Sequence, residues 1–253
     1  MPTYSGPSKE TMMLRREQGI VLRGFPFGEA DRIVVFVSPN QGQLRAVARG
    51  VRRTKSRFGG RLEPLTHVDL VLYQGRNLPT ITQVSVIEPF PRLRNELDAV
   101  LVAGSMAEVI GKVVVEGEPS HRLFLLLQRG LQALENGAGG LDLVASFLLK
   151  LMDALGQAPA LRWCAACGGD GPLERFSVAG GGLLCVRCDS GSSFRLRQGL
   201  TAYLAGLATS DLSGFTGGDG PMAGDAVGLA RRFVEFHIET GLSGLAYGSL
   251  NGG

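Results

Sequence analysis

The sequence predicts a multidomain α+β protein, in which an N-terminal β-barrel precedes a C-terminal helical bundle with a small cysteine-rich insertion. Apolar residues come in short alternating or β-branched runs from Gln18 to Glu88, and the pattern changes to a helical period after Pro91. All four cysteines fall within one short segment of the second half. The expected boundaries are 1–88 for the barrel, 89–160 and 191–253 for the helical domain, and 161–190 for the cysteine module.

Five segments of the N-terminal region are typical of β-strands. They cover residues 19–25, 32–37, 43–49, 65–73 and 80–87, and a turn is expected at Ser38–Gly42. Alternation in the fourth segment puts four residues on one face: Thr66, Val68, Leu70 and Leu72. Five strands without a helical period favour a small closed barrel. The expected type is an OB barrel, and an SH3-like barrel is the alternative that periodicity does not separate from it.

Five helical segments follow the strands. They cover residues 97–114, 120–134, 143–155, 200–207 and a final segment near the end of the chain. Asp225 is the expected N-cap of the last helix, and its core face is expected to contain Leu229, Phe233 and Phe236. Short connections between the first three helices predict antiparallel packing.

The cysteines form two Cys-x-x-Cys pairs, Cys164 with Cys167 and Cys185 with Cys188, and 17 residues separate the pairs. Two residues between cysteines let both thiolates turn toward one ion, and two such knuckles complete a tetrahedron. The spacing predicts one structural Zn²⁺ ion in a zinc ribbon; the alternative is four reduced cysteines or two disulfides. Because four thiolates leave no open coordination position, a catalytic zinc ion is not expected.

Positive charge is concentrated in the first third of the chain. Residues 1–90 contain 13 Lys and Arg against 7 Asp and Glu, whereas the whole chain has a net charge of only +3. No acidic residue occurs between Asp31 and Glu63, an interval that holds eight basic residues. A charge asymmetry of this kind indicates a polyanion-binding domain at one end.

The candidate DNA-binding residues lie on the third predicted strand and in the loop after it. They are Arg45, Arg49, Arg52, Arg53, Lys55, Arg57 and Arg61. Guanidinium groups suit phosphate, and an OB barrel offers a groove that follows the backbone of a single strand. The alternative is a solvated basic loop that only keeps the barrel soluble. Few aromatic residues are present for base stacking, so binding is expected to depend on backbone charge; they are Phe58 in the loop and Phe25, Phe27 and Tyr73 elsewhere.

Signatures of catalysis are missing from the sequence. The segment His237–Glu239 resembles the His-x-Glu of zinc deaminases, but it follows both cysteine pairs instead of preceding a Pro-Cys-x-x-Cys. Neither of the common phosphate-binding glycine motifs occurs, and three isolated histidines form no visible triad. We therefore expect no enzyme, no catalytic residues and no small-molecule substrate. The absence of a long apolar run or an apolar leader predicts a cytoplasmic protein without membrane contact.

The segments GFPFGEADRIVVFVSPNQG, GVRRTKSRFGGRLEPL and CAAC…CVRC, in this order, resemble the RecO family of bacterial recombination mediators. The resemblance implies an OB domain, a helical domain and a zinc module. It also implies sequence-independent binding of single- and double-stranded DNA and annealing of complementary strands. Together with RecR, such a protein remodels single-strand-binding protein on DNA so that RecA can load. By position, four residues match the basic loop of the family: Arg52, Arg53, Lys55 and Arg57. The four cysteines match zinc knuckles found in many members.

We therefore expect a non-enzymatic DNA-binding protein of recombinational DNA repair in the bacterial cytoplasm, associated with the nucleoid. Its expected partners are DNA, RecR, single-strand-binding protein and, indirectly, RecA. The alternative is a protein–protein adaptor with a structural zinc module, whose contact with nucleic acid is incidental.

Overall fold

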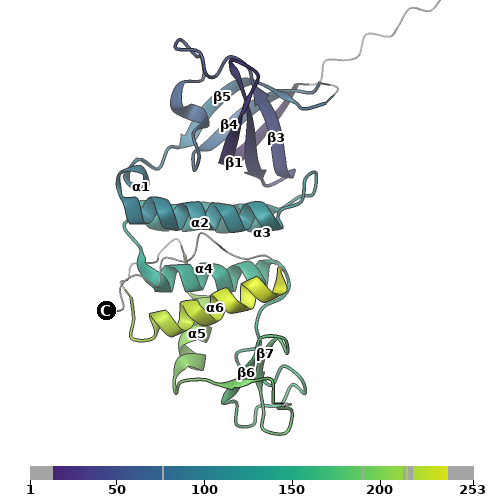
Figure 1. Ribbon diagram of the computed structural model, residues 1–253, viewed down its shortest axis with the longest axis vertical. Coiled ribbons are helices and arrows are strands. Elements are labelled where there is room, and N and C mark those ends of the chain that lie inside the picture. The colour runs from purple at the N-terminus through teal and green to yellow at the C-terminus, as the bar shows by residue number, and fades with distance from the viewer. Residues whose placement is uncertain (1–13, 76, 190, 213–214, 216–218, 239–253) are drawn as a thin grey trace, which may run out of the picture.

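Five strands at the N-terminus form a closed barrel. The computed structural model describes residues 14–75, 77–189, 191–212, 215 and 219–238. The strands are β1 (Leu14–Phe27), β2 (Asp31–Ser38), β3 (Gly42–Ala48), β4 (His67–Tyr73) and β5 (Thr80–Glu88). Their order around the barrel is β1-β2-β3-β5-β4, and β4 pairs with β1 to close it (Figure 1). This arrangement confirms the expected OB-type barrel.

Every strand contributes to the barrel interior, and β2, β3 and β4 do so with alternate residues. Phe36, Leu70 and Leu72 are among its buried side chains, as the period of two predicts. A single-turn 3-10 helix, η1 (Gly59–Leu62), follows the loop after β3. Leu62 of this turn and Phe58 just before it belong to the same core. The segment between β3 and β4 therefore places its apolar residues inside the barrel.

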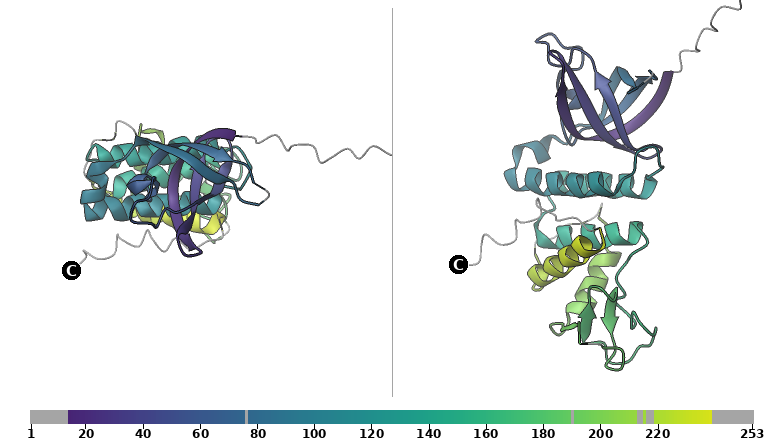
Figure 2. Two further views of the ribbon diagram at one scale, coloured as in Figure 1. Left: turned by 90° about the horizontal axis from the view of Figure 1, so that it is seen from above. Right: turned by 45° about the vertical axis from the view of Figure 1, so that its right-hand side comes forward.

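The helical region contains two layers below the barrel (Figures 1 and 2). After the short helix α1 (Pro91–Asn95), the upper layer consists of α2 (Leu97–Val113) and α3 (His121–Glu135). The lower layer contains α4 (Gly140–Ala154) and α6 (Ala223–His237), and α5 (Leu200–Thr209) packs against α4. One contiguous apolar core joins both layers, from Met106 through Phe147 to Phe233. Among the described helices, none has both the length and the apolar composition needed to span a membrane.

Three details of the predicted helices were wrong. Leu97, which the helical period places on the apolar stripe of the first predicted helix, is 70% exposed because it is the first residue of α2, after a break at Glu96. Met222, not Asp225, occupies the N-cap position of α6, and Asp225 lies in the first turn. Phe236 is 53% exposed, although Leu229 and Phe233 are buried as predicted.

Long-range polar contacts join the connections to the helices. Asp219, in the connection after α5, accepts hydrogen bonds from Leu141 N at 2.5 Å and Asp142 N at 3.3 Å, and so caps the N-terminus of α4. The buried carboxylate of Asp142 accepts hydrogen bonds from the Tyr203 hydroxyl and from Gly220 N. Burial and this carboxylate raise the pKa of Tyr203 to about 12, so the phenol is protonated and acts as a donor at neutral pH.

Backbone hydrogen bonds attach the barrel to the helical region. The turn between β2 and β3 meets the α2–α3 connection, where Gln43 N donates to Val115 O at 3.1 Å and Gly117 N donates to Gln41 O at 3.0 Å. Gly42 lies at the centre of this junction with φ +57. A Cβ atom at this position would overlap the carbonyl oxygens of Val115 and Glu118. Only glycine fits both the backbone conformation and the close approach.

We expect Gly42→Ala to destabilise the protein more than Gly28→Ala. Both glycines have left-handed φ values, +57 and +60, but a Cβ atom at Gly28 would meet no atom within 4 Å. The shared conformational cost is about 1–2 kcal/mol, and overpacking at Gly42 adds about 1–3 kcal/mol. Urea unfolding midpoints of both variants test this difference, and equal midpoints would show that the junction does not depend on the close approach.

Candidate nucleic-acid interface and metal centre

The loop that carries the basic residues is attached to the barrel at both of its ends. At its start, Gly50 N donates to the Asp31 carboxylate at 2.7 Å and Arg52 N donates to Ala30 O at 3.0 Å. At its end, Phe58 and Leu62 are buried in the barrel core. The cationic side chains between these anchors point outward from a backbone that is held in place on the β1–β2 hairpin.

The loop cations have few acidic neighbours. The side chains of Arg52, Arg57 and Arg61 donate to the backbone carbonyls of Gly28, Ile81 and Arg57 at 3.5, 3.4 and 3.0 Å, respectively. A carbonyl oxygen orients a guanidinium group without cancelling its charge. Arg53 and Lys55 are exposed, and no acidic residue in the described ranges forms an ion pair with either. The loop therefore presents uncompensated positive charge to solvent.

Arg45 has a different environment from the loop residues. It lies on β3, where its guanidinium forms an ion pair of 2.6 Å with Glu116 of the α2–α3 connection. Both side chains are about half exposed. Arg49 is exposed directly after β3. Of the seven basic residues predicted from sequence, Arg45 alone is thus neutralised by a carboxylate among the described residues.

Phe58 is not available for base stacking, because it is 1% exposed and packs inside the barrel. Arg57 covers it, with the guanidinium carbon 4.8 Å from the ring centroid. Phe25 and Phe27, by contrast, are 48% and 49% exposed on the part of β1 that extends beyond the barrel core. Arg23 lies beside them and was missed by the sequence analysis, because it falls outside the acid-free interval. The signal available in the sequence was the alternation of Arg23, Phe25 and Phe27 along the first predicted strand and just beyond it.

The four cysteines come together at the far end of the molecule from the barrel. Their sulfur atoms all lie within 4.8 Å of one another, and the Sγ atoms of Cys167 and Cys185 are 3.9 Å apart. A tetrahedral site with Zn–S bonds of about 2.3 Å has sulfur–sulfur edges of about 3.8 Å. The cluster therefore has the size and the donor set of a four-thiolate metal site.

Local backbone structure turns each cysteine pair toward the cluster. In the first knuckle, Cys164 N donates to Gly169 O and Gly168 N donates to Cys164 O, both at 2.8 Å. In the second, Cys188 N donates to Cys185 O at 3.0 Å. Hydrogen bonds from the backbone N–H groups of Cys185 and Cys167 lower the pKa of the Cys164 thiol to about 6, which favours its thiolate. Side-chain hydrogen bonds with the sulfur atoms of Cys185 and Cys167 raise the pKa of Cys188 to about 12.

A small three-stranded sheet supports the cysteines. Its strands are β6 (Arg175–Ser177), β7 (Gly182–Leu184) and β8 (Phe194–Arg195), in the order β7-β6-β8. Strand β8 lies beyond residue 190, outside the range 161–190 that was expected for the cysteine module. Phe176 of β6 packs edge-to-face against Phe233 of α6, with ring centroids 5.9 Å apart. This contact joins the cysteine module to the core of the helical region.

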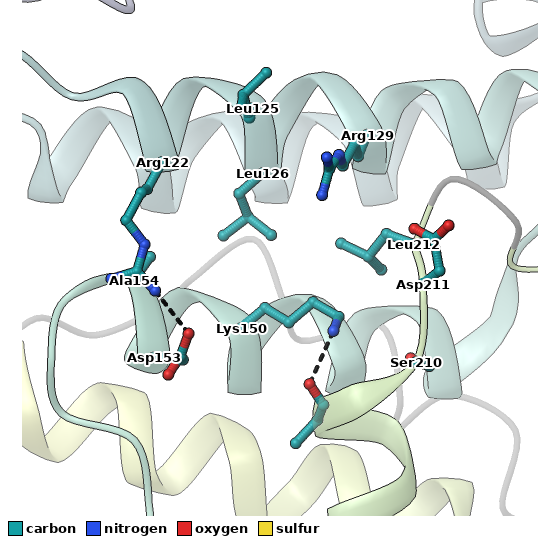
Figure 3. Close-up of a pocket in the computed structure, with 11 residues that line it drawn as sticks. Arg122, Leu125, Leu126, Arg129, Lys150, Asp153, Ala154, Ser210, Asp211 and Leu212 are labelled. Carbon is teal, nitrogen blue, oxygen red and sulfur yellow. Dashed lines mark hydrogen bonds and ion pairs between the residues drawn. The ribbon is translucent and has the colours of Figure 1, made fainter.

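A pocket of about 270 Å³ lies between α3, α4 and the end of α5 (Figure 3). Leu126 and Leu212 are among its apolar lining residues. Lys150 Nζ donates to Ala208 O at 2.8 Å, and burial lowers the pKa of Lys150. Arg129 reaches into the pocket from α3, opposite Lys150 (Figure 3). The pocket thus combines apolar residues with three basic residues, Arg122, Arg129 and Lys150, and two acidic residues, Asp153 and Asp211. Its residues come from distant segments of the chain, so it could not be predicted from the sequence.

The histidines do not form a site with one another. His67 is buried where the barrel meets α3, and burial lowers its pKa despite the nearby Glu88. His121 begins α3, and His237 stacks on Phe233 with ring centroids 4.1 Å apart. Glu239, the last residue of the His-x-Glu segment, lies outside the described residues. Among the described residues, the four cysteines are the group of potential metal ligands that lie close enough together to hold an ion.

Comparison with known proteins agrees with this architecture. The family model for the N-terminal part of recombination protein O matches residues 12–90, and the model for its C-terminal part matches residues 94–245. The chain is 42% identical over 233 residues to the DNA repair protein RecO of Rubrobacter xylanophilus, covering 90% of this chain and 92% of that protein. It is 39% identical over 239 residues to the DNA repair protein RecO of Frankia casuarinae, covering 93% and 98%. The chain therefore belongs to the RecO family.

Proposed function

We propose that this protein is a non-enzymatic DNA-binding mediator of recombinational DNA repair, which binds single- and double-stranded DNA without sequence specificity. The observation that carries the proposal is the anchored loop, whose cations face solvent with almost no acidic partners. The names of the relatives, DNA repair proteins, support the same role. In this proposal the barrel, residues 1–88, is the nucleic-acid-binding domain, and the helical domain and cysteine module serve structure and partner binding.

The proposed phosphate contacts are those that the sequence indicated. They are Arg49, Arg52, Arg53, Lys55, Arg57 and Arg61, with Arg45 contributing only if its ion pair with Glu116 opens. Arginine side chains that already donate to a carbonyl retain free N–H groups for a phosphate oxygen. Contacts of this kind recognise the backbone and do not read base sequence.

Annealing of complementary strands requires no bond to be made or broken in the protein. A surface of loop cations lowers the repulsion between two phosphate backbones and holds the strands near each other while their bases pair. We further propose that RecR and single-strand-binding protein are direct partners, and that RecA loading is the downstream result. This activity places the protein in the bacterial cytoplasm at the nucleoid.

We propose that the four cysteines hold one structural Zn²⁺ ion. The sulfur positions fit the tetrahedral shell, and four thiolates would fill it. The ion would link Cys164 and Cys167 to Cys185 and Cys188, and so hold the two knuckles together. It would supply no reaction chemistry, because no position is left for water or substrate.

Replacement of Arg52, Arg53, Lys55 and Arg57 together by alanine should weaken DNA binding and reduce its salt dependence. If about six phosphates of a single strand are contacted, log K should fall with log salt at a slope of about −4, and loss of four contacts should reduce the magnitude by about 3. Binding titrations at several salt concentrations measure both slopes.

A matched control removes four exposed arginines that are ion-paired and lie outside the barrel and the basic loop. They are Arg92, Arg122, Arg195 and Arg197. This control should retain the wild-type slope. An unchanged slope in the loop variant would leave the loop as a solvated surface and remove the basis of the proposal.

Metal analysis of the purified protein should find about one zinc ion per chain. Chelation should unfold the cysteine module and leave the barrel intact, because binding of structural zinc supplies about 10–16 kcal/mol. Trp163, the single tryptophan, adjoins Cys164 and reports the change by fluorescence. Cys164→Ser/Cys185→Ser should lose the metal, whereas Val186→Ser should keep it. A metal-free protein with unchanged amide protection over β6 and β7 would contradict the assignment.

The pocket between α3, α4 and α5 favours a second function, the docking of a protein partner. Its leucines and its three basic residues, which outnumber the acidic Asp153 and Asp211, suit a segment that carries both apolar and acidic side chains. Arg129→Glu should weaken binding of such a partner by at least tenfold and leave DNA binding unchanged; Arg92→Glu, away from the pocket, is the control. Calorimetry with purified RecR or single-strand-binding protein tests this, and wild-type affinity for both would argue against the pocket.

A further inference from the structure

The hairpin of β1 and β2 carries an aromatic surface that the sequence analysis did not assign. Alternation along β1 puts Arg23, Phe25 and Phe27 on one face. The guanidinium carbon of Arg23 lies 5.6 Å from the ring centroid of Phe25, which agrees with this placement. About half of each phenylalanine side chain is open to solvent, although exposure of two neighbouring large apolar residues carries a cost in water.

The strand register extends this face across the sheet. Val35 of β2 is paired with Arg23 of β1 on one side and with Arg45 of β3 on the other. Residues directly opposite each other in antiparallel strands point to the same side. Arg23 and Arg45 therefore belong to the face that carries the two phenylalanines, and Arg49 follows at the end of β3. We call Arg23, Phe25 and Phe27 the hairpin face.

The hairpin face is continuous with the basic loop. Arg52 of the loop donates to Gly28 O in the hairpin turn at 3.5 Å, and its backbone N–H donates to Ala30 O at 3.0 Å. Two acidic residues lie near this turn. Asp31 accepts the hydrogen bond from Gly50 N, and Glu29 is exposed. The hairpin turn that follows Phe27 and the start of the cationic loop thus lie side by side at one end of the barrel.

We propose that Phe25 and Phe27 form a stacking platform for the bases of single-stranded DNA, next to the phosphate-binding loop. Side chains at positions i and i+2 of a strand are about 6.8 Å apart, twice the rise of about 3.4 Å per nucleotide in a duplex. Each ring can take one base of an opened strand, whereas the bases of a duplex are stacked on each other and paired. The platform therefore gives the protein a preference for single strands.

The surroundings favour DNA over a protein as the occupant. Bases stack on aromatic rings while the phosphates on either side require cations, and this surface provides both at neighbouring positions. The inference rests on the proposed DNA-binding function and adds base contacts to it. It changes the expectation of binding through backbone charge alone, which followed from the small number of aromatic residues in this part of the sequence.

The first test is the variant Phe25→Ala/Phe27→Ala, titrated with oligo(dT) and with a duplex of equal length. Each lost stacking contact should weaken binding of the single strand by about 5- to 150-fold, with the duplex affinity and the salt slope unchanged. Phe25→Tyr/Phe27→Tyr should retain wild-type affinity because the rings remain. Ile87→Ala, another half-exposed apolar residue of the barrel, is the matched control. Circular dichroism verifies that each variant is folded.

The second test is spectroscopic. Phe25→Trp in a Trp163→Phe background places the single indole on the hairpin face. Oligo(dT) should quench its fluorescence by stacking, and the duplex should not.

The outcomes separate this inference from the proposed function. If wild-type protein binds no DNA, or the loop variant keeps its salt slope, both fail. If the loop variant behaves as expected but Phe25→Ala/Phe27→Ala binds oligo(dT) with wild-type affinity, only the platform is overturned. Loss of binding to RecR with unchanged DNA binding would also overturn it and would assign the two rings to a protein interface.

Discussion

The burial of Phe58 and Leu62 in the barrel core is the interaction on which the proposed DNA-binding surface depends. Full burial of one such side chain stabilises by about 1.5–3 kcal/mol, while ordering a single residue costs about 1–2 kcal/mol. Two buried side chains therefore do not hold the whole loop by themselves. The backbone hydrogen bonds at Gly50 and Arg52 supply the second anchor. The loop is then fixed at both ends, and its charges occupy defined positions beside the hairpin.

Basic residues of similar sequence context have different roles in the folded chain. Arg45 pairs with Glu116 and joins β3 to the α2–α3 connection, whereas Arg53 and Lys55 face solvent. The difference arises because the turn between β2 and β3 is held against the helical region by close backbone contacts around Gly42. The junction around Gly42 thus places Glu116 beside Arg45 and neutralises its charge. The loop cations lie at the other end of the barrel, where none of them has a carboxylate partner among the described residues.

The two candidate sites lie at opposite ends of one continuous structure (Figure 2). The helical core connects to the barrel through Ile20 and Val37 and to the cysteine module through Phe176. The module closes this core at its far end, and a four-thiolate shell suits such a structural role. Partner binding by the helical region, at the pocket that contains Arg129, would leave the barrel surface accessible to DNA.

The sequence alone determined what depends on neighbours along the chain. The period of two gave the strands and the inward face of β4, the helical period gave α2 to α6, and the cysteine spacing gave the knuckles, because each pattern reflects local backbone geometry. Contacts between distant segments decided the rest. They bury Phe58, pair Arg45 with a residue 71 positions away, and cap α4 with Asp219. They also leave Phe25 and Phe27 exposed, since periodicity marks which residues share a face but not whether another part of the chain covers that face.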